Sequence, residues 1–400
     1  MKCPVVPISD VCQQIRGVSY KGGEALDAPK DGYLPILRAN NISDGKVFYD
    51  DLVFVPQKYI SKTQVLRKND IVIAASSGSI EIVGKAAQIK DEFKGSFGAF
   101  CKVLRPNSDV DPRYLSYFFK TPFYRHTISH LAAGANINNL RNEHLDNLKI
   151  PFPPKPVQEK VTTVLEKAES ALEKRRQTIR LADEFLKSAF LEMFGDPVRN
   201  PKKLNVVLCG EISSHVTSGS TPLGGNATYL EEGILFIRSQ NVLMNRLDLS
   251  DVAYISNEVH HKMRRTWVKK DDILLNITGA SIGRVAFYEG EDDLANVNQH
   301  VCIIRPVKTK VLPEYLSFLI SMPNFQRTIL GKNAGATRQA FNFDQIKRFQ
   351  IPLALLSEQQ KFVDLVQKVE RLKEKQKQSE TELTNLFNSL MQRAFKGESF

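Results

Sequence analysis

Cysteine is scarce in this chain of 400 residues, and so are the other marks of a secreted or membrane protein. The five cysteines are odd in number, and none forms a Cys-x-x-Cys pair. This argues against a disulfide framework and against a zinc site. No apolar run reaches the roughly 20 residues needed to cross a bilayer. Residues 1–4 also lack the apolar core of a signal peptide. We therefore expect a cytosolic protein with no membrane partner.

The motifs of several enzyme classes are missing as well. Amino-methyltransferases that use S-adenosylmethionine need an Asn/Asp-Pro-Pro-aromatic loop, and the nearest string, Pro151–Pro154, has no Asn or Asp. Gly84-Lys85 fails the spacing of a Walker phosphate loop. Asp70 with Glu92–Lys94 could form a nuclease set, but such a triplet more often lies in a surface turn. The seven histidines form no ligand pattern. We therefore predict that the chain is not itself an enzyme.

Positive charge, by contrast, is abundant. The net charge is +11 and the pI is about 9.3. A basic balance of this size makes a polyanion the expected partner, and duplex nucleic acid is the commonest one. A basic surface kept for solubility is the alternative. The hydrophobic content of 42% suffices for two cored domains of about 150 residues each.

The chain repeats itself at an offset of 201 residues. The matching positions are Val5-Val6 with Val206-Val207, Tyr114–Ser116 with Tyr315–Ser317, Pro122 with Pro323, Gly134-Ala135 with Gly335-Ala336, Ile150-Pro151 with Ile351-Pro352, and Gln158 with Gln359. This period is far too long for a solenoid repeat. It indicates two duplicated modules, which suit a target that itself has two similar halves.

Each module is predicted to be α+β, with strands first and helices later. Short β-rich runs separated by turn residues predict strands at 34–38, 70–75 and 100–105, and again at 234–238, 272–277 and 301–305. Asp111 is a predicted N-cap with Pro112 at the first helical position, opening a helix over 113–120. Leu312-Pro313 opens the matching helix of the second module.

A long helix is predicted after each module. In the first, apolar residues alternate in spacings of four and three, which is typical of a heptad seam. They are Val161, Leu165, Ala168, Leu172, Ile179, Ala182, Leu186, Ala189 and Met193, with Arg175 the one break. Pro156 predicts the start of this helix and Gly195–Pro197 its end. In the second, Ser357 with Gln360 predicts a capping box. Its polar middle, Lys373–Glu382, is expected to be solvated or to pair with Glu173–Arg176.

The two long helices are expected to form a rod. A helix of about 39 residues is roughly 58 Å long. Because neither helix can bury its apolar stripe alone, antiparallel packing on each other is the simplest arrangement. The alternative is that each packs only on its own module. The predicted order is a module at 1–153, a helix at 154–196, a module at 197–352 and a helix at 353–400. A pseudo-twofold axis would then relate the modules, and the rod would set their separation.

Polar loops carry the candidate DNA-binding residues. Loop glycines let backbone amides approach a phosphate, while hydroxyls and basic side chains add hydrogen bonds and charge. Asn, Gln and Arg also read adenine and guanine edges. A fold-stabilising turn or a solvent-facing role is the alternative for each residue. The candidates in the first module are Arg38, Asn40, Asn41, Ser76, Ser77, Ser79 and Lys85. Those in the second are Arg238, Gln240, Asn241, Asn276, Thr278, Ser281, Arg284, Asn298, Gln299, Thr337, Arg338 and Gln339.

Over its whole length the chain resembles the specificity subunit of type I restriction–modification systems. Each supporting motif is modest alone, but their order, with a long helix after each module, is specific. The motifs are Thr217–Pro222, Gly233–Asn241, Thr278–Gly283, Asn298-Gln299, and Ile351–Leu353 followed by Ser357–Gln360. The first module departs from the pattern. Arg16–Lys21 replaces the Ser-Thr-Pro turn, and the loop at Ser76–Ser79 carries an insertion.

The resemblance implies two target-recognition domains, each reading one half of a split sequence in double-stranded DNA. The paired helices would set the spacer and dock two methyltransferase (M) subunits. Those subunits would hold S-adenosylmethionine, so no cofactor is expected on this chain. Restriction/motor (R) subunits would join for cleavage. The rival functions are a stand-alone DNA-modifying enzyme (methyltransferase or nuclease) and a coiled-coil scaffold with two protein-binding ends.

Overall fold

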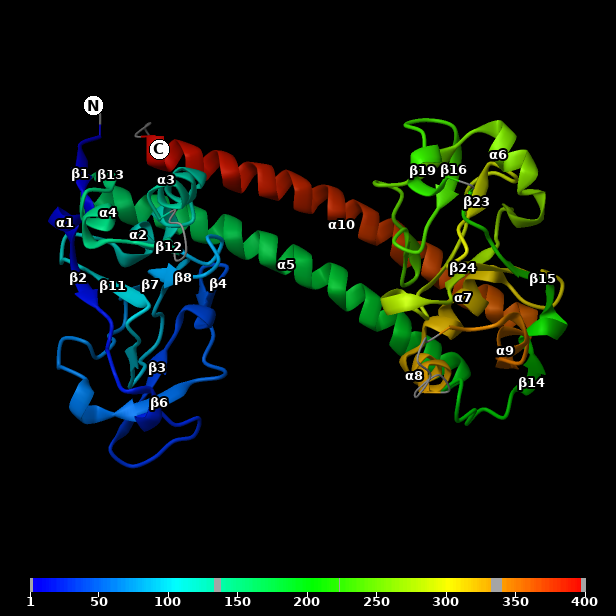
Figure 1. The fold of residues 1–400 in the computed structure, drawn as a ribbon, viewed down its shortest axis with the longest axis horizontal. Coiled ribbons are helices and arrows are strands. Elements are labelled where there is room, and N and C mark those ends of the chain that lie inside the picture. Colours follow the sequence, from blue (N-terminus) through cyan, green and yellow to red (C-terminus); the bar gives the residue numbers. More distant parts are fainter. Residues whose placement is uncertain (1–2, 133–137, 223, 332–339, 397–400) are drawn as a thin grey trace. The chain divides into compact units, whose positions relative to one another are not determined.

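A computed structural model describes residues 3–132, 138–222, 224–331 and 340–396. The chain divides into two compact units. Unit 1 comprises Met1–Arg176 and Gln378–Phe400, and unit 2 comprises Gln177–Lys377. Each unit therefore combines a strand-rich module with part of each long helix (Figure 1). This agrees with the predicted α+β class and with the duplication.

Unit 1 has two main sheets and a pair of strands that joins its ends. The first sheet has the order β2 (Cys12–Arg16), β11 (Cys101–Pro106), β7 (Ile71–Ala74) and β9 (Ala86–Gln88), all antiparallel. The second has β10 (Ser96–Phe97), β3 (Tyr33–Leu37) and β6 (Val53–Pro56). The two-stranded pairs are β1 (Val5–Pro7) with β13 (Lys149–Pro151), β4 (Ile42–Ser43) with β5 (Lys46–Val47), and β8 (Ser76–Ser77) with β12 (Asn138–Asn139). The short helices are α1 (Ile8–Val11), α2 (Pro112–Phe118), α3 (Pro122–Ala132) and α4 (Asn142–Asp146).

Unit 2 repeats this plan. Its first sheet has the order β15 (Ser213–Ser218), β24 (Val301–Pro306), β21 (Ile273–Asn276) and β22 (Val285–Phe287). Its second has β19 (Ala253–Ile255), β16 (Ile234–Ile237), β23 (Ala295–Val297) and β20 (Trp267–Val268). The two-stranded pairs are β14 (Asn205–Leu208) with β25 (Gln350–Leu353), and β17 (Val242–Leu243) with β18 (Arg246–Leu247). The short helices are α6 (Asn257–Lys262), α7 (Pro313–Ser321), α8 (Pro323–Gly331) and α9 (Phe343–Lys347). All six predicted strands are present, within a residue or two of their expected ends.

The repeated valines and Ile-Pro pairs have a common structural purpose. Val6 pairs with Ile150 across β1 and β13, and Val207 pairs with Ile351 across β14 and β25. The first and last strands of each module therefore pair antiparallel directly before the long helix begins. A module whose two ends meet in this way is a closed folding unit, which explains why the pattern recurs at both ends of each copy.

One of the two central strands of each first sheet, β7 in unit 1 and β21 in unit 2, is buried on both faces, and its alternate side chains point to opposite sides. In β7, Ile71 and Ile73 join the apolar cluster that contains Tyr114 of α2, while Val72 joins the cluster that contains Leu37 of β3. In unit 2, Ile273 and Leu275 face the helices and Leu274 faces β16. The first sheet thus lies between helices on one side and the second sheet on the other.

The long helices are α5 (Lys155–Phe194) and α10 (Leu356–Lys396). In unit 1, Val161 and Leu165 near the start of α5 share an apolar cluster with Met391 near the end of α10. In unit 2, Phe190 near the end of α5 shares one with Phe362 near the start of α10. The helices are therefore antiparallel within each unit, as predicted. No helix in the described part of the chain has the length and apolar character to span a membrane.

The end of α5 confirms the prediction, and the start of α10 corrects it. Helix α5 ends at Phe194, and Gly195 takes a φ of +78°, as expected for a glycine stop. The capping box at Ser357 and Gln360 was wrong, because α10 begins one residue earlier and Gln360 instead donates to Asp364.

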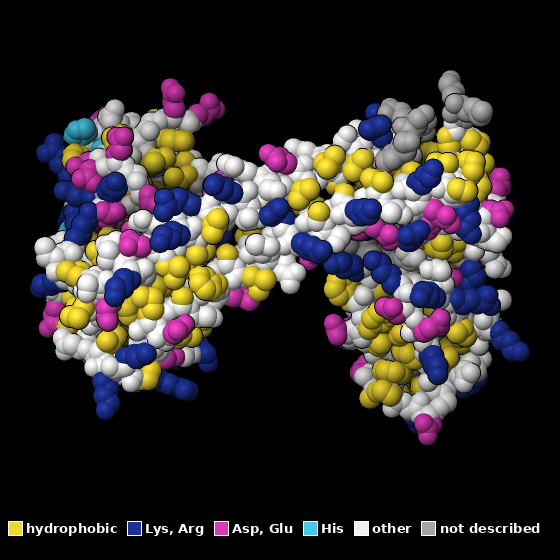
Figure 2. Space-filling model, turned by 180° about the vertical axis from the view of Figure 1, so that it is seen from behind, with side chains coloured by type: hydrophobic (Ala, Val, Ile, Leu, Met, Phe, Trp, Pro, Cys, Tyr) yellow, Lys and Arg dark blue, Asp and Glu magenta, His cyan; other side chains and the backbone are white. Residues whose placement is uncertain are grey.

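The polar middle of α10 pairs in part with α5. Arg176 donates to Glu380 at 2.8 Å within unit 1, and Lys373 donates to Asp183 at 2.6 Å within unit 2. Figure 2 shows Lys and Arg side chains interspersed with Asp and Glu over one face of the chain. Such mixing is typical of a solvated, ion-paired surface.

One buried glutamine ties each module to its long helix. Gln158 of α5 accepts the backbone N–H of Asp111 at 2.9 Å, and Gln359 of α10 accepts that of Leu312 at 2.8 Å. Both side chains are fully buried. Gln158 and Gln359 therefore occupy equivalent positions of the repeat, and each accepts a hydrogen bond from the residue directly before a module helix, α2 in unit 1 and α7 in unit 2.

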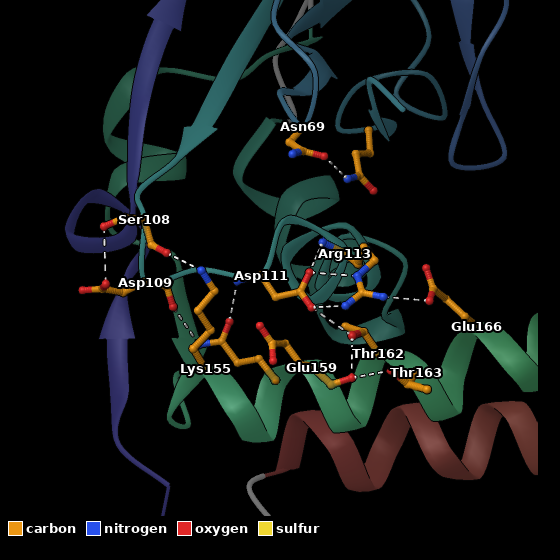
Figure 3. A network of polar contacts seen from close by, with 12 residues as sticks. Asn69, Ser108, Asp109, Asp111, Arg113, Lys155, Glu159, Thr162, Thr163 and Glu166 are labelled. Atoms are coloured by element: carbon orange, nitrogen blue, oxygen red, sulfur yellow. Dashed lines mark hydrogen bonds and ion pairs between the residues drawn. The ribbon is translucent and has the colours of Figure 1, made fainter. Parts of the chain in front are cut away.

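In unit 1 this junction is surrounded by charged groups (Figure 3). The Asp111 carboxylate accepts the backbone N–H and the guanidinium of Arg113, and also the Thr162 hydroxyl at 3.0 Å. Arg113 also reaches Glu166 of α5 at 2.9 Å. Burial raises the pKa of Asp111, but these hydrogen bonds outweigh it, so the pKa lies below the ordinary Asp value. The predicted N-cap role of Asp111 is confirmed.

Candidate nucleic-acid interface

In each unit, three loop segments meet at the carboxyl end of one buried strand, which is β7 in unit 1 and β21 in unit 2. In unit 1 they are residues 38–41, 75–85 and 98–101, held together where Gly98 N–H donates to Leu37 and Ala75 N–H donates to Phe100. In unit 2 they are residues 238–241, 276–284 and 298–301, held by equivalent bonds from Asn298 to Ile237 and from Ile277 to His300. We call these the loop clusters of units 1 and 2. They contain most of the predicted DNA-binding residues.

These hydrogen bonds define which residues of the two clusters are equivalent. The bond from Ala75 to Phe100 corresponds to the bond from Ile277 to His300. Phe100 and His300 therefore occupy the same place, although they are 200 residues apart rather than 201. Ser76 corresponds in the same way to Thr278. Insertions in the loops change the number of residues between equivalent positions of the two units, whereas the pairing of the strands is the same in both.

The turns at 38–41 and 238–241 use their polar groups on themselves. Asn41 accepts the N–H of Arg38 and donates to the carbonyl of Asp50, and its side chain is 2% exposed. Arg38 pairs with Asp51 at 2.7 Å, and exposed Asn40 donates to the same carboxylate at 3.2 Å. Asn41 therefore holds the turn and cannot reach DNA in this conformation. Its assignment as a DNA contact is corrected to a positioning residue.

The matching turn of unit 2 behaves alike. Asn241 accepts from Arg238 at 2.9 Å, donates to the carbonyls of Asp248 and Asp251, and is also 2% exposed. Gln240 is exposed and donates to Asp251 at 2.9 Å. Arg238 lies over the Tyr229 ring, 5.5 Å from its centroid. Asn241 is thus also a positioning residue, whereas Gln240 can reach solvent.

Asn276 joins two segments of the unit 2 cluster from within. Its side chain is fully buried and donates to the Ser239 carbonyl at 2.8 Å and to the Ser281 hydroxyl at 3.1 Å. The prediction that Asn276 contacts DNA is corrected for the same reason as for Asn41. In unit 1 the equivalent residue is Ala74, which offers no such hydrogen bonds. The unit 1 cluster is therefore held differently.

The turn before β24 is polar. The Asn298 carboxamide is largely buried and accepts the N–H of His300 at 3.1 Å. Thr278 Oγ1 and His300 Nδ1 lie 2.5 Å apart, which orients the imidazole. Gln299 is exposed beside it. Of the predicted pair, Gln299 is presented to solvent, and Asn298 shapes the turn.

The serine loop of unit 1 is oriented by a residue that sequence reasoning missed. Ser76 and Ser77 are partly exposed, Ser79 is exposed, and Lys85 is partly exposed. Arg125 of α3 donates to the carbonyls of Ile80, Glu81 and Val83, which fixes the return of this loop. Gln326 of α8, 201 residues later, donates to the Gly283 carbonyl at 2.8 Å. The repeat offset alone could have pointed to this pair.

The structure describes three of the remaining predicted residues, and the other three lie outside the described ranges. Thr278 and Ser281 are partly exposed at the rim of the unit 2 cluster, and Arg284 is exposed. Thr337, Arg338 and Gln339 lie outside the described residues. The chain returns to the cluster directly after them, where Ala340 bridges to Thr278 and Phe341 N–H donates to Ile277.

The groups with catalytic potential are used in the fold. Asp70 forms a two-pronged ion pair with Arg105 at 2.8 Å, as Asp272 does with Arg305 at 2.7 Å. Burial raises the pKa of the Cys101 thiol to about 12. Within the described ranges, no three His, Cys, Asp or Glu side chains gather as a metal site would require.

Comparisons with known proteins agree on one family. A model described as the type I restriction modification DNA specificity domain matches residues 2–181 and 216–385, once in each half of the chain. The StySPI specificity subunit of Salmonella potsdam is 31% identical over 425 aligned positions, covering 98% of this chain and 88% of that protein. The EcoKI specificity subunit of Escherichia coli K12 is 32% identical over 423 positions, with the same coverage.

Two solved structures share the fold. A chain from a type I restriction–modification system, studied for its assembly and conformational transition, has a TM-score of 0.61 at 18% identity, and the match covers 100% of this chain and 98% of that one. The specificity subunit from M. genitalium has a TM-score of 0.58 at 16% identity, with 99% and 96% covered. At these identities the likeness concerns the fold alone.

Proposed function

The chain belongs to the family of type I restriction–modification DNA specificity subunits, and from this premise we propose that it reads a DNA target made of two separated half-sites. The observation that carries the proposal is the duplicated loop cluster. Each unit brings polar residues from three distant segments to one end of a rigid sheet. Half-sites read by separate modules and divided by an unread spacer match this duplication.

The proposed DNA contacts are the predicted residues whose side chains reach the surface of the clusters, together with the three that lie outside the described residues. Hydroxyls and basic groups would bind phosphates, and amide and guanidinium groups would read base edges. In unit 1 they are Arg38, Asn40, Ser76, Ser77, Ser79 and Lys85. In unit 2 they are Arg238, Gln240, Thr278, Ser281, Arg284, Gln299, Thr337, Arg338 and Gln339.

The chain itself is proposed to be non-catalytic. Methyl transfer would come from two methyltransferase subunits that dock on the long helices and carry S-adenosylmethionine, and cleavage from restriction/motor subunits. The use of Asp70, Asp272 and the buried thiols in the fold supports this division of labour. Labelled S-adenosylmethionine and duplex DNA should yield no methylated DNA with the pure chain, and should yield it once the methyltransferase subunit is added.

The binding proposal is tested by selection from random duplex DNA with the chain in complex with its methyltransferase subunit. The expected result is a target with two specified half-sites and an unspecified spacer of constant length. Affinity should fall steeply as salt rises, because phosphate contacts release counterions. A complex that selects no sequence, or binds DNA without salt dependence, would instead favour the scaffold function.

The helices are proposed to set the spacer, since both run without a break from one unit into the other. Four residues inserted between Gln177 and Thr178 add about 6 Å and rotate the following segment by about 40°. The selected spacer should lengthen by one or two base pairs, while both half-sites stay the same. A two-residue insertion turns the apolar stripe away from its partner and should impair assembly. An unchanged spacer after the four-residue insertion would contradict the proposal.

A further inference from the structure

Phe100 belongs to the unit 1 loop cluster and is exposed to solvent. Its side chain is 67% exposed, more than that of any other large apolar residue described in unit 1. Single exposed apolar residues are common on protein surfaces. The position of Phe100, however, is unusual, because its carbonyl accepts the backbone N–H of Ser76, which is a proposed DNA contact.

The backbone around Phe100 is rigid. The Phe100 carbonyl accepts hydrogen bonds from the N–H groups of Ala75 and Ser76, at 2.8 and 3.1 Å. The preceding turn is closed by the N–H of Cys101, which donates to Gly98 at 2.8 Å. Beyond Phe100 the chain enters β11, which pairs on both of its edges. The exposed ring is therefore presented from a fixed base, which limits the ordering entropy lost when it makes a contact.

Gly17 allows this arrangement. A Cβ placed on Gly17 would lie 2.0 Å from the Gly98 carbonyl oxygen, so the residue that follows β2 and the turn of Phe100 touch through their backbones. In unit 2, a Cβ on Gly219 would lie 1.6 Å from the Val297 carbonyl oxygen. In both units a glycine therefore makes a close backbone contact with the turn that carries Phe100 or His300.

The equivalent residue of unit 2 has a different chemistry. His300 is partly exposed, and Thr278 holds its Nδ1 at 2.5 Å. Its Nε2 lies 3.4 Å from the side-chain nitrogen of exposed Gln299. An imidazole takes part in hydrogen bonds, whereas a phenyl ring offers only its apolar faces and edges. The same place in the two loop clusters is thus apolar in one unit and polar in the other.

We propose that Phe100 stacks on a base step of the half-site read by unit 1, and that His300 makes a polar contact with the half-site read by unit 2. The inference rests on the proposed function. An aromatic ring exposed on a turn that is hydrogen-bonded to Ser76, a proposed phosphate contact, suits the π-face of a base, either by stacking or as a wedge between adjacent bases. The two units would then distinguish their half-sites by different physical means at one equivalent position.

The test uses the complex with the methyltransferase subunit and the duplex selected above. Phe100→Ala should weaken binding about tenfold, the scale of one base-stacking contact. Phe100→Trp should retain most of the affinity, because it keeps an aromatic face. Phe123→Ala is the matched control, since Phe123 is another phenylalanine of unit 1 with a side chain 59% exposed. It should bind like the wild type.

Two further measurements locate the contact. The effect of Phe100→Ala should vanish only when the half-site read by unit 1 is scrambled. The effect of His300→Ala should vanish only when the half-site read by unit 2 is scrambled. With 2-aminopurine placed in turn at each adenine of the first half-site, or opposite each of its thymines, binding should change the fluorescence at one step, and Phe100→Ala should abolish that change.

The outcomes separate the inference from the function on which it rests. A wild-type complex that selects no sequence would overturn both. Specific binding by the wild type together with unchanged affinity and unchanged 2-aminopurine signal in Phe100→Ala would overturn only the role of Phe100. So would an equal loss in Phe123→Ala, because the effect would then not depend on the position of the ring.

Discussion

The two junctions between module and long helix share the hydrogen bonds that align their backbones but differ in some of the side chains around them. Gln158 and Gln359 make the same contact, and Tyr114 and Tyr315 both donate to the carbonyl of the proline that ends the module. Around this shared frame, unit 1 places an ion-paired network. Unit 2 has a group of aromatic rings in which the centroid of the Phe190 ring lies 5.6 Å from that of Phe318 and 5.3 Å from that of Phe362.

The difference follows from single positions of the repeat. Asp111, Arg113 and Thr162 of unit 1 correspond, 201 residues later, to Leu312, Glu314 and Val363 of unit 2. A duplicated fold thus keeps the bonds that align the backbone, while Leu312 and Val363 make the junction more apolar and Glu314 reverses the charge of Arg113. Buried apolar contacts depend little on charge, whereas an ion-paired network fails when one member is removed. The two junctions should therefore respond differently to substitution and to pH.

The largest effect is expected in the aromatic junction. Phe190→Ala removes a ring that is 1% exposed and leaves a cavity, so unit 2 should lose about 3–5 kcal/mol of unfolding free energy. Fluorescence of Trp267, the single tryptophan and a residue of unit 2, reports urea unfolding of that unit. Phe185→Ala on the same helix, where the ring is 52% exposed, is the control and should shift the urea midpoint little.

The polar junction should be the next most sensitive. Asp111→Ala removes the N-cap of α2 and leaves Arg113 and Thr162 without their shared acceptor, at a cost of about 2–3 kcal/mol. Hydrogen exchange measured by mass spectrometry should show faster exchange in α2 and in neighbouring peptides of unit 1. Asp109→Ala, an exposed carboxylate two residues away, should leave exchange unchanged. Equal effects of the two substitutions would mean that the network contributes nothing.

Exchanging one residue between the junctions should have a smaller effect. Val363→Thr puts a hydroxyl into the junction of unit 2, where Leu312 replaces the Asp111 carboxylate that accepts from Thr162 in unit 1, and should cost about 1–2 kcal/mol. The reciprocal change, Thr162→Val, loses one hydrogen bond to Asp111 and should cost about 1 kcal/mol in unit 1. Trp267 fluorescence measures the first change and hydrogen exchange the second. A stabilising Val363→Thr would show that the unit 2 junction is less apolar than its contacts imply.

The smallest effect concerns pH. Burial raises the pKa of Glu314, so its charged form destabilises unit 2, and this cost fades as pH falls through the raised pKa. The Trp267 urea midpoint of the wild type should therefore rise relative to that of Glu314→Gln as pH falls from 8 through the raised pKa. Measuring the difference between the two proteins cancels other titrating groups, including His260, which stacks on Trp267. A constant difference across this range would contradict the prediction.

Unit 1 should show the opposite dependence. Burial raises the pKa of Glu169, but Lys120 and Tyr117 outweigh it, so the pKa of Glu169, like that of Asp111, is lowered. Their contribution is present above the ordinary pKa values near 4 and is lost as pH falls through the lowered ones. Hydrogen exchange in α2 should therefore stay unaffected at pH 5 and increase only below about pH 4.

Much of the fold could be predicted from the sequence because it depends on local patterns. The apolar positions from Val161 to Met193 predicted α5 and its seam, and each is buried or half-buried. The strand at 70–75 followed from a short apolar run between turn residues. The repeated Val6 and Ile150 were found as a pattern, but only the structure showed that they pair with each other. Pairing between distant segments leaves no trace in local periodicity.

The candidate site was less predictable, because exposure depends on which segments meet. Asn41 and Asn276 have the side chains of base-reading residues, yet both are buried and hold the loops together. Phe100 reads as the first residue of an apolar strand, yet its side chain is among the most exposed of the chain. Residue type alone therefore selected the right loops but could not separate surface residues from supporting ones.

The amino-acid sequence by itself determined the duplication, the order of strands and helices, and the family, since these depend on residue patterns along the chain. Tertiary structure decided what each polar residue does. Ala75 and Phe100 meet because β7 and β11 pair, and Asn276 is buried because the turn at Ser239 closes over it. Whether a side chain binds solvent, DNA or its own backbone is set by these neighbours, and they lie tens of residues away along the chain.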